Sequence, residues 1–291
     1  MSRGQRIVSD FVCETKSHEN DLKFLSAKLS KDSLEGQEGV LPVLGYRQPL
    51  QNLPDGTKMF QLVFELPTGP ARNSLSHLLH TRSSPDLVER LALCRKLAVA
   101  TNAAHSIGLV HKALRARSIL VLSAPGAPLS TSKVYLQDWT CAREVSGTTA
   151  ELGEGVWPKR IYQHPERQGE YAEAAYEPKH DIYSLGVCML EVLLWTPFVV
   201  TDMELKVRDL FQQYGFARKE IDGGLPERFR GDSTKMTSRP WITKTIWQDI
   251  AAAEFGNPDL AQLISQCLEG SLVSANDVDS CLRDSMLAPG P

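Results

Sequence analysis

Apolar residues recur with two different periods in the first part of the chain. Residues 19–31 place three leucines on one helical face and charged side chains elsewhere, which predicts an amphipathic helix. Two apolar runs follow, residues 39–50 and 59–67, and the Pro-Asp-Gly turn signal between them predicts an antiparallel hairpin. The first part of the chain is therefore expected to combine strands with one helix.

The helical period dominates after this hairpin. Residues 73–80 predict a short helix with Asn73 as its N-cap. Residues 85–108 carry apolar side chains at three- and four-residue spacing and end at a glycine, which predicts a long helix. Two short apolar runs, residues 118–123 and 133–139, flank a loop rich in Pro, Gly and Ser and predict a second hairpin.

The last third of the chain is mostly helical in its pattern. Residues 179–195 are apolar nearly all round, as in a helix buried at the centre of a domain. Residues 202–214, 241–254 and 258–268 predict three further helices, and a polar loop joins the first two. A small strand-containing part followed by a mostly helical part predicts an α+β fold with two lobes.

Composition excludes several classes of function. The 291 residues are 42% hydrophobic and 23% charged, as in a globular protein that can form one large domain or two small lobes. The formal net charge of -3 gives no sign of a nucleic-acid or anionic-membrane partner. The apolar run 187–195 is too short for a membrane span and contains Glu191, and the N-terminus lacks the apolar stretch of a secretory signal.

Six cysteines are scattered along the chain, without a C-x-x-C pair and without a histidine close enough in sequence to complete a zinc site. This distribution favours buried, reduced thiols and therefore a cytoplasmic protein.

Five segments, taken in order, resemble the motifs of the protein kinase superfamily between about residue 19 and about residue 270. LVFELP followed by NSLSHLL resembles the strand, hinge and short helix between the kinase lobes, and HKALRARSIL resembles the catalytic loop H-R-D-L-x-x-x-x-N. LQDWTCARE resembles L-x-D-F-G, YQHPER resembles A-P-E, and HDIYSLGVCMLEVL resembles the buried helix that opens with D-x-Y-S-L-G-V. The chain is also similar to kinase-like domains that accompany cell-death modules in fungal proteins, in which H-K replaces H-R.

The resemblance implies a two-lobed kinase-like fold in one domain. Residues 1–67 would form an abbreviated N-lobe that ends in the hinge, and residues 68–291 the C-lobe. Phe64 would occupy the gatekeeper position, and the backbone from Glu65 through Leu66 to the following proline would face an adenine ring. Asp138 would stand at the metal-binding position, and Asp181 would accept hydrogen bonds from the backbone of the catalytic loop.

The catalytic loop departs from the kinase pattern where the chemistry takes place. His111 is retained, but Ala113 stands where the Asp accepts the proton of the substrate hydroxyl. Ser118 offers a neutral hydroxyl where an Asn amide oxygen usually binds metal. Lys112 keeps the charge of the usual Arg without its rigid fork, and Arg115 keeps a cation that faces the transferred phosphate in kinases.

The N-lobe lacks a phosphate-binding loop, because no G-x-G-x-x-G precedes the first predicted helix. Residues 11–16 could be the lysine-bearing strand, which would make Lys16 the phosphate-binding candidate and Glu19 or Asp21 its helix partner. The alternative is that Lys16 is one cation on a solvated, charged face. A gene product that has lost its first two strands would also explain the short N-lobe.

The other end of the domain departs from the pattern as well. In kinases the A-P-E glutamate, here Glu166, pairs with an Arg near the C-terminal end of the domain. No R-P follows residues 264–268, and Arg283, the nearest candidate, is out of register. We therefore expect this end of the fold to be rebuilt.

Three functions are compatible with these residues. The first is an inactive pseudokinase that acts as a regulatory or protein-binding module for an unidentified protein partner. The second is a weakly active or unconventional kinase that uses Asp138 alone for metal, and the third is a fragment or paralogue whose role is purely structural. With one metal carboxylate and one phosphate-binding candidate, Lys16, we expect binding of ATP with Mg²⁺ to be weak or absent.

Overall fold

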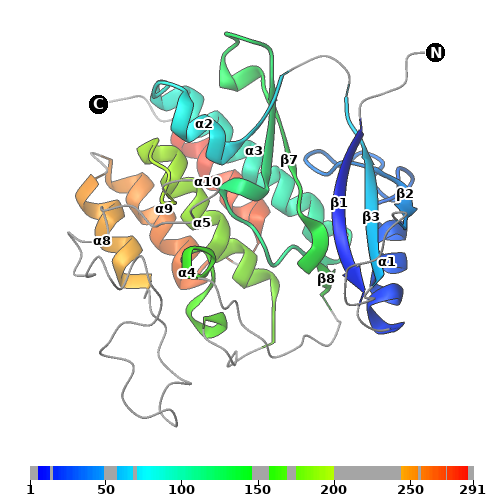
Figure 1. Ribbon diagram of the computed structural model, residues 1–291. Helices are drawn as coiled ribbons and strands as arrows, with labels where there is room; N and C mark the ends of the chain where they lie inside the picture. The colour runs from blue at the N-terminus through cyan, green and yellow to red at the C-terminus, as the bar shows by residue number, and fades with distance from the viewer. Residues whose placement is uncertain are drawn as a thin grey trace.

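A computed structural model gives the architecture of the protein and describes residues 6–13, 16–48, 58–67, 71–145, 157–168, 175–199, 244–254, 257–272 and 274–287. Within these residues, a three-stranded sheet with one helix stands beside a larger part that is mainly helical (Figure 1). This mixture of helices and small sheets agrees with the α+β class expected from the sequence.

The three-stranded sheet contains the predicted hairpin and one further strand. Its order is β1-β3-β2 and its neighbours run antiparallel, with β1 at Arg6–Cys13, β2 at Val43–Arg47 and β3 at Lys58–Glu65. The two hairpin strands were predicted from their apolar runs, and the predicted turn between them lies outside the described residues. The long strand β1 was only partly anticipated, because its sequence mixes charged, polar and apolar residues.

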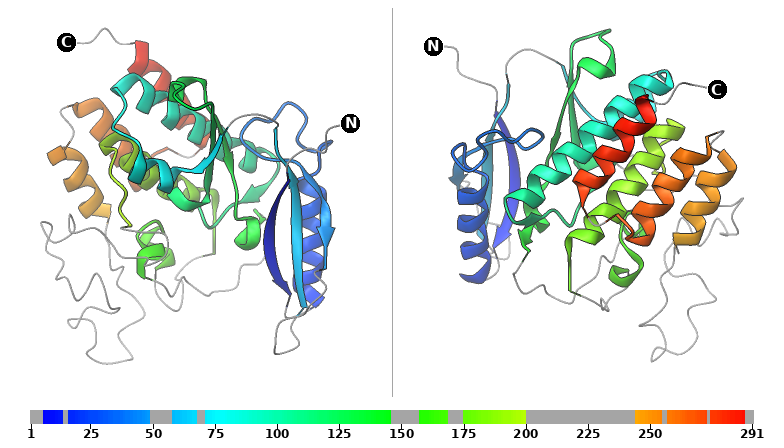
Figure 2. Two further views of the ribbon diagram at one scale, coloured as in Figure 1. Left: turned by 45° about the horizontal axis from the view of Figure 1, so that its top comes forward. Right: turned by 180° about the vertical axis from the view of Figure 1, so that it is seen from behind.

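Helix α1 (Lys16–Lys28) corresponds to the predicted amphipathic helix and begins three residues earlier. It packs beside the three-stranded sheet (Figure 2). Leu22 and Leu25, and Leu29 just after the helix, are all buried. The leucine spacing therefore predicted the face on which this helix joins the core.

The loop after α1 passes very close to the helical part. Gly39 has a φ of +92°, and a Cβ atom at this position would lie 2.3 Å from the Cα atom of Ala100. The Gly39 carbonyl accepts a hydrogen bond of 2.9 Å from the backbone N–H of Leu136. Only glycine combines this backbone conformation with such an approach, so Gly39 helps to join the small sheet to the rest of the fold.

The helical part is a stack of long helices that pack on one another (Figure 2). Helix α3 contacts α5 and α10, α5 contacts α9, and α9 contacts α8. Their bounds are α3 at Leu87–Ser106, α5 at Pro178–Leu194, α8 at Lys244–Glu254, α9 at Pro258–Glu269 and α10 at Ala275–Leu287. Helix α10 was not predicted, and the predicted helix 202–214 lies outside the described residues.

Helix α5 is the buried central helix that its apolar sequence predicted. From His180 to Leu193 every residue is buried. A Cβ atom on Gly186 would meet the Cβ of Cys267 at 2.8 Å, so the glycine permits the close packing of α5 on α9. Glu191, the one acid in the middle of this helix, accepts hydrogen bonds from the Tyr162 hydroxyl and the Phe198 backbone N–H at 2.9 and 2.7 Å.

A second sheet, in the order β4-β6-β7, contains the other predicted hairpin. Its strands are β4 (Ala71–Ser74), β6 (Ile119–Ser123) and β7 (Lys133–Leu136), and a short pair joins β5 (Leu109–Val110) to β8 (Arg143–Glu144).

Helix α2 (Leu75–Thr81) follows β4, and its cap corrects the prediction. Ser74, not Asn73, is the N-cap, because the Ser74 hydroxyl accepts the backbone N–H of His77 at 3.1 Å. Asn73 is instead the third residue of β4, one position too early to cap the helix.

Among the described helices, none is both long and apolar enough to cross a bilayer.

Candidate active-site region

The loop at residues 111–118 is held by a buried carboxylate at the start of α5. Asp181 accepts the backbone N–H of His111 at 2.7 Å and that of Lys112 at 3.0 Å. Lys112 has a φ of +65°, so this loop includes a left-handed non-glycine residue that its surroundings must stabilise. The expected hydrogen bonds from the loop backbone to Asp181 are therefore confirmed.

Two side chains complete the environment of Asp181. The Tyr176 hydroxyl donates to it at 2.7 Å, and His105 Nε2 lies 3.1 Å from its other oxygen. Burial by itself would raise the pKa of Asp181, but the hydrogen bond from His105 and the nearby charges outweigh it, and the pKa lies below its ordinary value. Asp181 is thus a buried anion with four donors, which suits an architectural role.

His111 also has structural surroundings. Its side chain is fully buried, lies edge-on to the Trp139 ring at a centroid distance of 4.8 Å, and places Nε2 3.0 Å from the Gln137 carbonyl. Burial lowers the pKa of His111, which favours the neutral ring with its proton on Nε2. This histidine links the loop to the segment that contains Asp138.

Ser118 closes the same loop on itself. Its hydroxyl accepts the Arg115 backbone N–H at 3.0 Å and lies 2.7 Å from the Ala113 carbonyl, to which it can donate. The side chain is buried. The hydroxyl that stands at the expected metal position is therefore engaged in shaping the loop backbone.

Asp138 begins a short 3₁₀ turn (Trp139–Cys141) in a left-handed conformation, with φ of +66°. One carboxylate oxygen lies 3.0 Å from the Arg115 guanidinium, and the other accepts the Thr140 hydroxyl at 2.9 Å. Mg²⁺ requires oxygen ligands that are free to coordinate it. Because Asp138 is paired with Arg115 and the Ser118 hydroxyl is used within the loop, the described residues in this arrangement do not form a site that fits a magnesium ion.

Phe64 and Asp138, which the sequence assigned to a nucleotide site, line one cavity of about 290 Å³. Strand β1 contributes Ile7 and Val8 to its wall. This volume is close to the lower limit for a small-molecule pocket. The two predicted residues, 74 positions apart in the sequence, are thus brought together.

The hinge backbone does not line that cavity. Glu65, Leu66 and the proline after them line a different hollow of about 580 Å³. The backbone N–H of Glu65 donates to the Pro42 carbonyl at 2.9 Å, so this donor is already used. The structure therefore does not gather Phe64 and the Glu65–Pro67 backbone around one cavity, and an adenine-binding role for Glu65 and Leu66 stays a prediction.

Lys16 does not lie on a strand. Strand β1 ends at Cys13, and Lys16 is the first residue of helix α1. One candidate partner, Asp21, lies 3.9 Å from the Arg143 guanidinium, an ion pair at the limit of the usual distance. The expected strand at residues 11–16 therefore ends before it reaches Lys16. Phosphate binding by Lys16 stays a prediction.

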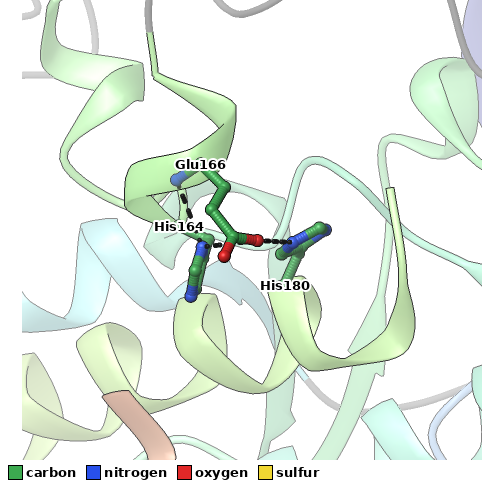
Figure 3. Close-up of side chains that lie close together, drawn as sticks. All are labelled: His164, Glu166 and His180. Atoms are coloured by element: carbon green, nitrogen blue, oxygen red, sulfur yellow. Dashed lines mark hydrogen bonds and ion pairs between the residues drawn. The ribbon is translucent and has the colours of Figure 1, made fainter. Parts of the chain in front are cut away.

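Glu166 sits on a short 3₁₀ turn and faces the start of α5 (Figure 3). One oxygen of its carboxylate lies 3.3 Å from His180 Nε2 and 3.2 Å from Lys179 Nζ, and His164 Nδ1 is 3.7 Å away. Arg283 instead pairs with Asp279, four residues before it on α10. Among the described residues, the partners of Glu166 therefore come from α5 and from His164, and Arg283 is not one of them.

The cluster of His164, Glu166 and His180 has the residue types of a metal site, and its ligand atoms lie within 4.8 Å of one another. His180 Nδ1 accepts the Glu177 backbone N–H at 2.9 Å, which leaves the proton on Nε2, directed at Glu166. A metal at Nε2 would have to displace that proton and compete with Lys179. The geometry fits a structural network of hydrogen bonds and ion pairs better than a metal centre.

A further cavity of about 390 Å³ was not foreseen from the sequence. It is lined by five cationic side chains, those of Lys112, Arg115, Arg143, Lys159 and Arg167. Burial, followed by the proximity of Arg143 and Arg167, lowers the pKa of Lys112 to about 8. Lys112 and Arg115 stand out in the catalytic-loop segment of the sequence, but Arg143, Lys159 and Arg167 are too widely separated for any motif to have revealed them.

A comparison with protein-family models places these features in one family. The model for protein tyrosine and serine/threonine kinases matches residues 53–219, which is more than half of the chain. The matched range includes the 111–118 loop, Asp138, Glu166 and helix α5. A comparison with curated proteins found no match.

Proposed function

Since the chain belongs to the protein kinase superfamily, we propose that it is a pseudokinase that acts as a regulatory or protein-binding module. One observation carries this proposal, which is that Ala113 stands at the position of the proton acceptor. A second feature supports it: the carboxylate at the metal position, Asp138, is paired with Arg115 at 3.0 Å.

The chemistry of phosphoryl transfer explains why Ala113 and the pairing of Asp138 with Arg115 matter. A kinase accelerates transfer by positioning the nucleotide, neutralising its phosphates with metal and accepting the proton of the attacking hydroxyl. Loss of an essential group commonly lowers the rate by several orders of magnitude, on the order of several kcal/mol in the barrier. Here the acceptor is absent and both metal positions are engaged by protein groups, so these losses act on the same step.

The same proposal includes the arrangement of the domain. The sheet β1-β3-β2 with helix α1 corresponds to an abbreviated N-lobe within residues 1–67, and the helical stack to a C-lobe within residues 68–291. Support comes from the strand order, and from Gly39 and Leu136, which connect the two parts through a backbone hydrogen bond of 2.9 Å.

ATP binding is expected to be weak and nearly independent of magnesium. The cavity shared by Phe64 and Asp138 can bury part of an adenine ring, but the sequence before α1 contains no G-x-G-x-x-G loop to bind the phosphates. Burial of the ring alone corresponds to a dissociation constant in the high micromolar to millimolar range, roughly -4 to -6 kcal/mol. The anionic phosphates would have to be desolvated without a well-placed metal ion.

A cytoplasmic location belongs to the same proposal. Cys94, Cys188 and Cys267 are free thiols inside the core, and burial raises the pKa of each of them. Buried, protonated thiols are typical of proteins from a reducing compartment.

The alternative function is a weakly active or unconventional kinase. It is favoured by one observation, which is that Asp138 lines both the cavity of Phe64 and the cationic cavity. Release of Asp138 from Arg115 would give it one carboxylate for metal at the junction of these two cavities.

A phosphotransfer assay separates the two functions. The purified chain is incubated with γ-labelled ATP, magnesium and a mixture of Ser-, Thr- and Tyr-containing peptides, beside an active kinase as the positive control. The proposal predicts that label in the peptides and in the protein itself stays at the level of the Asp138→Ala variant. Incorporation that disappears in Asp138→Ala would establish the alternative.

A further inference from the structure

A cavity of about 420 Å³ lies between helix α3, strand β7 and the loop that follows α1. Its wall joins three segments that are far apart in the sequence, within residues 37–39, 92–99 and 130–135. Its volume is within the range of ligand-binding pockets. Phe64, Glu65, Leu66 and Asp138 do not line it, so this cavity is separate from the candidate nucleotide and metal positions.

The edge of β7 at this cavity is only partly paired. The backbone N–H of Gln137 donates to the carbonyl of Ser118, the residue before β6, at 2.9 Å. The N–H of Leu136 points the other way and donates to Gly39, also at 2.9 Å. Because successive residues of an antiparallel strand direct their backbone groups to opposite sides, Val134 directs its N–H and C=O to the same side as Leu136. Among the described residues, no group forms a hydrogen bond with the Val134 backbone on that side.

These two open backbone groups belong to a buried residue. Val134 is 5% exposed and lines the cavity. The loop after α1 pairs with β7 in a single parallel bridge, between Val40 and Leu136, and its residues 37 and 38 line the same cavity. A buried backbone group without a partner costs a free energy similar to that of a lost hydrogen bond. The cavity therefore offers one donor and one acceptor in the arrangement that another extended backbone would pair with.

Positive charge predominates on the rest of the wall. Lys96 donates to three backbone carbonyls of the turn before β7. Neither Lys96 nor the exposed Lys133 forms an ion pair with a described residue. Arg95 is compensated by Asp279 at 2.9 Å, and Glu38 is the one acid among the described residues of the wall. An acidic side chain on a ligand would therefore be favoured next to Lys133.

We propose that this cavity binds an extended peptide segment of a partner protein, which adds a strand to β7 by pairing with Val134 and places an acidic side chain near Lys133. In strand addition the backbone hydrogen bonds supply affinity, and pockets for alternate side chains supply specificity. Ala92 and Val99 of α3 provide an apolar floor for a neighbouring side chain. This inference rests on the proposed function as a protein-binding module and assigns to that function a site and a class of partner.

Nuclear magnetic resonance of the full chain, with its valine amides labelled with ¹⁵N and assigned, tests the inference. The probe is the blocked peptide acetyl-Ala-Val-Asp-Val-Ala-amide, in which the valines favour an extended backbone. One control peptide replaces Asp by Lys, and the other carries an N-methyl group on every residue, which removes the donors that strand pairing requires.

We expect the Asp peptide to bind with a dissociation constant below about 1 mM. It should shift the Val134 amide signal and slow the hydrogen exchange of this amide by about tenfold or more. The Lys peptide should bind more weakly, and the N-methylated peptide should not bind. Absence of binding by the Asp and Lys peptides at about 10 mM would overturn the inference, and so would equal binding of the N-methylated peptide.

Variants place the binding at this cavity. Ala92→Trp, which fills its floor, should weaken binding of the Asp peptide by about tenfold or more. Val88→Trp, at a 62% exposed position of the same helix outside the cavity, should leave the affinity within about twofold. Lys133→Glu should reverse the preference between the Asp and Lys peptides. Unchanged affinity in Ala92→Trp would contradict the inference. If that variant fails to fold, as judged by its thermal transition, an unchanged preference in Lys133→Glu, a substitution at an exposed position, contradicts it instead.

The phosphotransfer assay on the same preparations separates this inference from the proposed function. Absence of peptide binding together with absence of transfer removes only the inference. Transfer that depends on Asp138 removes the pseudokinase proposal, whatever the peptides show.

Discussion

The 111–118 loop has an anchor, Asp181, and a reaction centre, formed by Ala113, Ser118 and Asp138. The polar groups of these two regions are used differently. At the anchor, Asp181 receives four hydrogen-bond donors, two from the loop backbone and two from His105 and Tyr176. At the reaction centre, Asp138 and Ser118 interact with neighbouring protein groups, and Ala113 offers no polar side chain. The anchor fixes the shape of the loop through contacts that do not involve Ala113, Ser118 or Asp138.

The difference shows which residues report the fold and which report the function. Removal of one partner from a buried polar network leaves the others unsatisfied, so the fold of this domain depends on the network around Asp181. A reactive side chain at the surface of a cavity contributes little to stability and can be replaced at low cost. Asp181 therefore indicates the fold, whereas Ala113, Ser118 and Asp138 determine whether the site can catalyse phosphoryl transfer.

The largest effect is expected when the anchor is removed. Asp181→Ala leaves two backbone N–H groups, the Tyr176 hydroxyl and His105 without their acceptor, which should lower the free energy of unfolding by about 3 kcal/mol or more. Chemical denaturation measures the loss. Asp181→Asn, which keeps one acceptor oxygen, should lose less, and a stability of the Ala variant equal to that of the wild type would refute the role of the anchor.

Substitution at the junction between the small sheet and α3 should have the next largest effect on the free energy of unfolding. Gly39→Ala introduces a Cβ atom 2.3 Å from the Ala100 Cα, in addition to the strain at positive φ, and should cost about 2–4 kcal/mol. Gly36→Ala is the matched control, because its φ is +74° but no atom lies within 4 Å of the added Cβ. It should cost only about 1–2 kcal/mol. Equal losses in the two variants would show that the close approach at Gly39 is unimportant.

Acid should lower the stability of the fold through two buried histidines, His111 in the loop and His180 in α5. Burial lowers the pKa of His111 and His180 below 6.5 in the folded protein, so the unfolded chain binds more protons below that pH. The free energy of unfolding should therefore fall as the pH drops from neutral through 6.5 towards the folded pKa values. Asp181 adds a further loss only below its ordinary pKa of 3.8.

Denaturation midpoints measured across this pH range test the expectation. His180→Gln should reduce the pH dependence of the free energy of unfolding, because it removes one of the two histidines whose pKa is lowered. An unchanged slope in this variant would contradict the assignment of His180.

Release of Asp138 should produce a smaller effect at the reaction centre. The side chains of Arg115 and Asp138 are 18% and 35% exposed, so Arg115→Ala should cost about 1 kcal/mol or less in stability. It also leaves the carboxylate available for metal, so a magnesium-dependent rise in melting temperature should appear that the wild type lacks. Arg115→Lys, which keeps the cation, should show no such rise, and identical magnesium responses in all three proteins would argue against the pairing.

No gain of activity is expected when the lost residues are restored. Ala113→Asp with Ser118→Asn replaces the proton acceptor and the second metal ligand, but the residues before α1 still contain no G-x-G-x-x-G loop. Labelled phosphate transferred by the double variant should stay at the level of Asp138→Ala. Strong transfer would show that the reaction centre is incomplete only in these two residues.

Much of the fold could be predicted from the sequence, because the apolar patterns of α1, α3 and α5 match their buried faces closely. Helix α10 was missed although Ala275, Val278 and Leu282 recur at helical spacing and are buried. Asp279 in this helix also pairs with Arg95 of α3 at 2.9 Å. Residues 73 and 74 could both cap α2, and only the length of β4 decides between them.

The site was predictable where a motif is contiguous, and not where the fold assembles it. His111, Asp138 and Asp181 could be located from short motifs. The pairing of Arg115 with Asp138 spans 23 residues, and the cationic cavity joins side chains from Lys112 to Arg167. Spacing along the chain contains no information on such contacts, because they depend on how the loops pack.

Calorimetric titration of the wild-type chain with ATP, in the presence and absence of magnesium, tests the central claim most directly. That claim is that the reaction centre has kept its shape while its metal positions are engaged by the protein itself. We expect weak or undetectable binding that magnesium does not strengthen. Low-micromolar binding that requires magnesium would contradict it, because Asp138 would then have to exchange Arg115 for the metal.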